Sequence, residues 1–176
     1  MSHVPQTGQT TPYLAGDDGN LQRGLPWPNP RFTDNEDGTV TDNLTELIWL
    51  KDASRFGTRT WSQALDDCNT LAADGGDLKD GSVPGDWRLP NVRELNSLIH
   101  YGVQGPALPN TAGTGKWSED IGPFTGVQFV QCYYWSSTTF ASNTHYALLV
   151  SMHNGFVNQG NKEHTNYVWP VRGGSW

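Results

Sequence analysis

The residues best suited to chemistry lie late in the chain: Cys132 and the histidines His145, His153 and His164. A thiol beside an imidazole can act as a nucleophile, and converging imidazoles can bind zinc. The spacing supports neither, because there is no short His-x-His pair and no neighbouring feature that would activate the thiol. The chain also lacks Gly-x-Ser-x-Gly, His-Glu-x-x-His, phosphate-loop and Gly-x-Gly-x-x-Gly motifs. We therefore expect no enzyme activity and assign no catalytic residue.

Acidic residues near the start of the chain are the best metal candidates. Asp34, Asn35, Asp37 and Asp42 could offer several oxygens on a tight glycine-containing loop, as hard cations require. The run lacks the spacing of an EF-hand loop and its terminal glutamate. A hairpin turn at Asp37-Gly38, with φ > 0 at both central residues, accounts for the same residues. We expect no cofactor, and calcium at Asp34, Asp37 and Asp42 stays the alternative.

Cys68 and Cys132 are the two cysteines of the chain. In an oxidising compartment they could form a disulfide, and otherwise each could be a small buried hydrophobic residue. Their separation in the sequence does not decide between these alternatives.

The composition excludes several classes of partner. Hydrophobic residues make up 35% of the chain, too many for disorder, and its 20 Gly and 11 Pro are too many for a helical bundle. The net charge is -7 and the basic residues are scattered, so neither nucleic acid nor anionic membrane is an expected partner. No apolar stretch reaches the roughly 20 residues that span a bilayer, so we expect no direct membrane insertion.

The first ten residues are polar and lack the apolar core of a secretory signal. The chain is therefore either cytoplasmic or a mature form from which a signal was removed. The abundance of Gly, Asn, Thr, Ser, Tyr and Trp favours the second alternative, an extracellular or cell-surface location.

Local signals predict an α+β domain. Residues 1–26 form an N-terminal arm that packs on or leads into a domain at 27–176. Capping boxes at Thr60-Trp61-Ser62-Gln63 and Asn91-Val92-Arg93-Glu94 predict two helices, the second ending near Gly102. A long loop is expected at 105–126, and strands of a mostly antiparallel sheet are expected at 31–33, 39–42, 47–49, 133–135, 146–150, 155–157 and 167–171.

The tryptophans divide by their setting. Those on periodic apolar segments are expected in the core, whereas Trp117 and Trp176 lie in a loop and a tail and are expected to be freer. The expected core tryptophans are Trp49, Trp61, Trp87, Trp135 and Trp169.

Several ordered blocks carry a family resemblance: Phe32 to Asp42, Leu47-Ile48-Trp49, Asp86 to Asn91 with Glu94-Leu95, Phe124 to Val127, Tyr134 to Thr138, and Val168 to Gly174. From about Gly8 to Gly174 the chain resembles the Lcl C-terminal domain (DUF1566) family. That family is named after the C-terminal domain of a bacterial collagen-like adhesin and is similar in fold to C-type lectins and to formylglycine-generating enzymes.

The resemblance implies a C-type-lectin-like fold with two helices, a mostly antiparallel sheet and long loops. Its late strands and loops would form the binding surface of a non-catalytic recognition module for a protein or glycan ligand. Residues 139–166 suit that surface, and they also suit the variable region that diversity-generating retroelements mutate in related lectin-fold proteins. The predicted contact residues are Phe140, Ser142, Asn143, His145, Leu149, Ser151, His153, Asn158, Gln159, Asn161, His164 and Asn166.

The chain also departs from its relatives. It lacks the Glu-Pro-Asn, Gln-Pro-Asp and Trp-Asn-Asp motifs of calcium-dependent lectins, the late cysteine pair of formylglycine-generating enzymes, and the basic character with which the adhesin binds sulfated polymers. Glu46 stands where the family usually has a Gly turn. Two alternatives stay open: a structural, for instance trimer-forming, tip domain of a bacterial surface adhesin, and an enzyme of the formylglycine-generating type.

Overall fold

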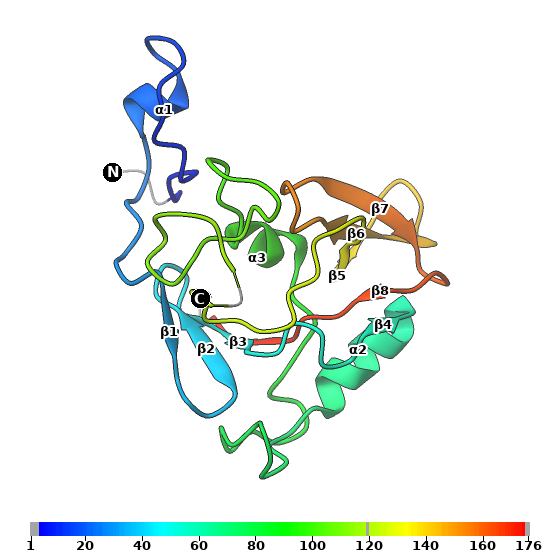
Figure 1. Ribbon diagram of the computed structural model, residues 1–176. Helices are drawn as coiled ribbons and strands as arrows, with labels where there is room; N and C mark the ends of the chain where they lie inside the picture. The colour runs from blue at the N-terminus through cyan, green and yellow to red at the C-terminus, as the bar shows by residue number, and fades with distance from the viewer. Residues whose placement is uncertain (1–3, 119, 175–176) are drawn as a thin grey trace.

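The computed structural model describes residues 4–118 and 120–174 and confirms an α+β fold. Two sheets and the short helices α1 (Asp18–Leu21), α2 (Trp61–Thr70) and α3 (Val92–Ser97) make up the regular structure. Figure 1 shows the strands β1–β3 and β5–β7 on opposite sides of the molecule, with the arm standing away from the body. A specifically C-type-lectin-like arrangement stays a prediction.

The first sheet is antiparallel and has the strand order β1-β2-β3-β9. Its strands are β1 (Phe32–Asp34), β2 (Thr39–Asp42), β3 (Leu47–Leu50) and β9 (Val171–Gly173). The expected two-residue turn at Asp37-Gly38 was wrong. Residues 35–38 form a longer loop in which Glu36 and Gly38 have φ of 61° and 90°. The Asp37 carboxylate instead accepts a hydrogen bond from Thr39 N, which shapes the turn locally.

The second sheet has the strand order β4-β8-β5-β6-β7. Its strands are β4 (Thr58–Arg59), β8 (Asn166–Tyr167), β5 (Tyr134–Thr139), β6 (Tyr146–Val150) and β7 (Val157–Asn161). All neighbours are antiparallel except β5 and β8. Strand β4 was not predicted, β5 extends four residues beyond the predicted strand at 133–135, and β7 begins two residues later than predicted.

The expected strand at 167–171 is in fact two strands in different sheets. β8 ends at Tyr167, residues 168–170 cross between the sheets, and β9 begins at Val171. Pro170 lies in the crossing, where its missing N–H interrupts no ladder. Trp169 lies in this crossing with its ring fully buried, and its Nε1 donates to Leu50 O at 2.8 Å. One segment therefore ties the two sheets together.

Both capping boxes are confirmed. Thr60 and Gln63 cap α2, and Asn91 and Glu94 cap α3 through reciprocal side-chain and backbone hydrogen bonds. Helix α3 ends at Ser97, five residues before Gly102, and Leu98 continues it only as a turn. Among the described residues, no helix is long and apolar enough to cross a membrane.

Most of the tryptophan predictions hold. Trp49, Trp87, Trp135 and Trp169 are fully buried, whereas Trp61 is only half-buried. The freer position expected for Trp117 was wrong, because its ring is buried and its Nε1 donates to Phe124 O at 3.2 Å. Trp176 lies outside the described residues.

The arm contacts the domain at its base. Trp27 Nε1 donates to Gln6 O at 2.7 Å, and Tyr101 N donates to Thr7 O at 2.9 Å. The Trp27 ring lies 4.3 Å from the Arg31 guanidinium and 5.0 Å, edge-on, from His100. These contacts hold Gln6 against Trp27 and Thr7 against the turn that follows α3.

Candidate ligand-binding surface

Two of the predicted contact residues point inward. Leu149 is only 4% exposed and packs with Trp135 in the hydrophobic cluster beside α2. Ser151 is buried, and its hydroxyl accepts a hydrogen bond from His153 N at 3.2 Å. Neither side chain is available to a ligand at the surface.

Two loops at the right-hand end of the second sheet in Figure 1 hold five of the other ten predicted residues. We call these loops, residues 140–145 and 162–165, the tip. Lys162 N donates to His145 O at 3.0 Å and so joins the two loops. The Lys162 ammonium donates to Thr139 Oγ1 at 2.9 Å and lies 3.8 Å from the centre of the Trp61 ring. Lys162 therefore fixes the tip to β5 and α2.

The tip displays polar and aromatic side chains. Ser142, Asn143, His145 and His164 are exposed, and Phe140 is half-buried. Asn143 Oδ1 accepts a hydrogen bond from His145 N at 3.1 Å, which shapes the first loop. Within the described part of the chain, the hydroxyl of Ser142 and the imidazoles of His145 and His164 make no hydrogen bond. Their donors and acceptors are therefore available to a ligand.

Asn161 and Asn166 adjoin the tip in more structural roles. Both are half-buried, and Asn161 Oδ1 accepts a hydrogen bond from Glu163 N at 3.0 Å at the start of the second loop. Asn166 lies in β8 and pairs with Arg59 of β4. Asn161 and Asn166 therefore hold the ends of the second loop of the tip in the sheet.

The remaining predicted residues lie away from the tip. Asn158 and Gln159 are exposed on β7, the edge strand of the second sheet, where Asn158 Oδ1 accepts from Gln159 N at 2.9 Å. His153 is exposed in the turn between β6 and β7, at the opposite end of those strands. Of the twelve predicted residues, seven therefore lie at or beside the tip and two lie on the edge strand. His153 lies at the opposite end of the sheet, and Leu149 and Ser151 lie inside the domain.

Lys162 joins the loops of the tip, and the sequence did not indicate this role. A lysine between Asn161 and Glu163 carries no local signal, and its role arises from contacts with Thr139 and Trp61, which are distant in the sequence. Such a residue can be found only once the strands are paired.

Comparison with known proteins places this architecture in a family. A family model described as the Lcl C-terminal domain matches residues 38–172, well over half of the chain. The chain belongs to this family. A comparison with curated proteins gives no match. The matched span runs from the first hairpin to β9, so the tip of this Lcl C-terminal domain lies inside the family region and the arm lies outside it.

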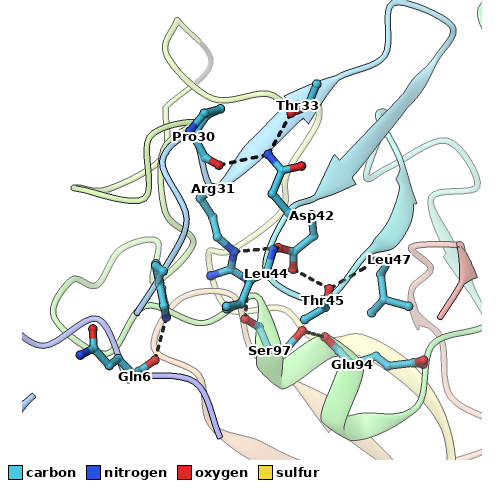
Figure 2. Close-up of polar contacts among 12 residues, drawn as sticks. Gln6, Pro30, Arg31, Thr33, Asp42, Leu44, Thr45, Leu47, Glu94 and Ser97 are labelled. Atoms are coloured by element: carbon cyan, nitrogen blue, oxygen red, sulfur yellow. Dashed lines mark hydrogen bonds and ion pairs between the residues drawn. The ribbon is translucent and has the colours of Figure 1, made fainter. Parts of the chain in front are cut away.

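The acidic residues of the first hairpin do not converge in this Lcl C-terminal domain. Asp34 pairs with Lys51 at 2.5 Å, and Asp37 accepts from Thr39. Asp42 is fully buried at the far end of the hairpin and binds Arg31 through two hydrogen bonds of 2.8 Å (Figure 2). Across residues 4–118 and 120–174, no group of three or more His, Cys, Asp or Glu side chains could hold a metal ion.

The two cysteines are free thiols and form no disulfide. Cys68 is fully buried on the inner face of α2, and Cys132 is half-buried near His153 in a shallow cavity of about 370 Å³. Burial raises the pKa of both thiols, which disfavours the thiolate that a nucleophile requires. The disulfide alternative is therefore wrong for this structure.

Proposed function

We propose that this Lcl C-terminal domain is a non-catalytic recognition module whose tip contacts a protein or glycan ligand. One observation carries the proposal: Ser142, His145 and His164 are exposed and uncommitted on two loops that Lys162 fixes together. Side chains on a fixed frame lose less conformational entropy on binding than side chains on a mobile loop. The half-buried Phe140 adds apolar area beside these polar groups.

The test compares two sets of variants on arrays of defined glycans and of purified extracellular-matrix proteins. We expect Ser142→Ala/His145→Ala/His164→Ala to lose the binding that the wild-type chain shows. The matched control, Gln104→Ala/His153→Ala, changes exposed polar residues at the other end of β6 and β7 and should keep that binding. Equal binding by both variants would place the ligand elsewhere, and no wild-type binding to either array would contradict the proposed ligand classes.

Calcium independence is part of the same proposal. The carboxylates of Asp34, Asp37 and Asp42 are each engaged by protein donors, so they offer no ready set of cation ligands. We expect the array signals to be the same in calcium and in a chelator. Loss of the binding signal in the chelator would support the alternative that calcium binds at Asp34, Asp37 and Asp42.

We also propose that a retroelement diversifies residues 139–166. The tip supports this proposal, because its exposed positions can change without disturbing the core, whereas Leu149 and Ser151 cannot. Sequencing around the gene should show a near-copy of this segment that differs mainly at adenines, beside a reverse transcriptase. The mismatched codons should fall at positions such as Asn143 and His145, and not at Leu149. Absence of any near-copy would identify a fixed module.

A second candidate function, self-assembly, is favoured by the arm. Tyr13 and Leu14 are 79% and 76% exposed, and Leu21 and Leu25 are also exposed, so the arm presents apolar side chains that the domain does not cover. We expect sedimentation to show a trimer or other oligomer that Tyr13→Asp/Leu14→Asp converts to a monomer. A wild-type monomer at every concentration would exclude this candidate.

A further inference from the structure

A groove lies where the arm meets the domain, away from the tip. Its volume is about 560 Å³, and it is lined by residues 4–7 of the arm, by Trp27, by α3 and the turn after it, and by Leu148 and Val157 of the second sheet. Val157 is the first residue of β7, whereas the tip follows the last residue of that strand. The groove and the tip are therefore separate surfaces.

The floor of the groove is apolar. In the β6–β7 ladder, Val157 pairs with Val150, and paired residues lie on the same face of the sheet. Leu148 is two residues before Val150, so its side chain lies on that face as well. Ile99 lines the groove from the edge of the core, where it is 2% exposed, while Val157 and Tyr101 are 50% and 49% exposed. A concave apolar surface of this volume is typical of sites that enclose a small organic molecule.

One charged side chain, Arg93, lies among the residues that line the groove. Arg93 is exposed on the first turn of α3 and, among the described residues, its guanidinium makes no hydrogen bond and no ion pair. Other arginines of the chain, such as Arg31 and Arg88, are paired with carboxylates. Arg93 is therefore an uncommitted cation beside an apolar floor, on a protein whose net charge is -7.

The polar residues beside Arg93 are already used within the protein. Tyr101 OH donates to Asn96 Oδ1 at 3.1 Å, and Asn96 Nδ2 donates to Gly155 O at 3.4 Å. These bonds hold the turn after α3 against the start of β7 and so fix the wall of the groove. The guanidinium is the charged group of this lining, and a guanidinium selects an anion.

We propose that the groove binds a small amphipathic organic acid, with an aromatic or aliphatic body and one carboxylate or sulfonate. The body contacts Ile99, Leu148 and Val157, and the anionic group pairs with Arg93. This site goes beyond the recognition function of the tip, because it uses none of the tip residues.

The test uses two fluorescent probes that differ by one charged group. 8-Anilinonaphthalene-1-sulfonate carries a sulfonate, and N-phenyl-1-naphthylamine has the same rings without it. We expect both to bind saturably, Arg93→Gln to weaken the sulfonate probe about fivefold and leave the neutral probe unchanged, and Val157→Asp to weaken both. The control Arg23→Gln removes another exposed arginine, one that does not line the groove, and should change neither.

Three outcomes would overturn the proposal: no saturable binding of the sulfonate probe up to about 1 mM, equal weakening by Arg93→Gln and Arg23→Gln, or equal weakening of both probes by Arg93→Gln. Near-ultraviolet circular dichroism of each variant verifies that the probes report a folded groove and not a loosened core. The tip variant Ser142→Ala/His145→Ala/His164→Ala should leave probe binding unchanged, so the two proposals can fail independently.

Discussion

The first hairpin and the tip are both rich in polar side chains, and they use them in opposite ways. In the hairpin, Asp42 is fully buried, and its oxygens accept hydrogen bonds from Arg31, from Leu44 N and from Thr45 Oγ1. At the tip, His145 is exposed, and its ring has no hydrogen bond within the described chain. The residue types alone do not separate these cases. The difference lies in whether the fold supplies a partner.

That comparison predicts the largest effect for Asp42→Ala. The substitution leaves the Arg31 guanidinium buried without its counter-charge, and Arg31 Nη1 already has no hydrogen-bond partner. Breaking a buried pair by removing one partner costs about 3–5 kcal/mol of the free energy of unfolding. Urea unfolding of the wild-type chain and of Asp42→Ala measures this difference in the free energy of unfolding.

The matched control is Asp34→Ala in the same hairpin. Its ion pair with Lys51 is about one-third exposed on both sides, so its loss should cost less than about 1 kcal/mol. If the two variants unfold at the same urea concentration, burial of the Arg31–Asp42 pair does not distinguish the hairpin from the tip.

The next largest effect is expected inside the second sheet, at Gly160. A Cβ at this position would lie 2.7 Å from Leu149 Cδ1 and 3.1 Å from the Trp135 ring. Gly160→Ala should therefore destabilise the domain by about 1–3 kcal/mol through overpacking. Its neighbour Gln159 is exposed, so Gln159→Ala should change thermal stability little. If Gly160→Ala leaves the stability of the domain unchanged, the core beneath the edge strand is loosely packed.

A smaller effect, of opposite sign, is expected at Glu46 in the turn between β2 and β3. Its φ is 60°, a left-handed conformation that costs a non-glycine residue about 1–2 kcal/mol. Glu46→Gly should stabilise the domain by about 0.5–1 kcal/mol, because the greater entropy of glycine in the unfolded chain offsets part of that gain. Glu46→Ala keeps the unfavourable backbone, so a gain there would assign the effect to the side chain instead.

Local signals in the sequence predicted the local parts of the fold. The capping boxes at Thr60 and Asn91 were confirmed because each is completed within four residues. Trp117 is buried in a core cluster that is assembled from segments between Phe32 and Val171, and the division of the last strand around Pro170 depends on pairing with β3 and β4. No pattern within a short window carries that information.

The candidate surface was predictable as a segment and not as a set of side chains. A polar composition marked residues 139–166. The alternation of side chains along a strand does not say which alternate set faces the core, and the pairing of β6 with β5 and β7 decides that Leu149 faces inward. The approach of two loops at Lys162 depends on the same pairing. In the sequence Arg93 is marked only by its place in a capping box, because the lack of a partner for its guanidinium depends on where every other side chain lies.

The smallest effect on stability is expected at the tip itself. Ser142→Ala/His145→Ala/His164→Ala removes exposed groups that no other described residue uses, so the free energy of unfolding should change by less than about 0.5 kcal/mol. A loss of 2 kcal/mol or so would show that these side chains support the fold, as Asp42 does. Lys162→Met provides the contrast. Removal of its ammonium breaks the contacts with Thr139 and Trp61, so this one substitution should cost about 1 kcal/mol, more than the three tip changes together.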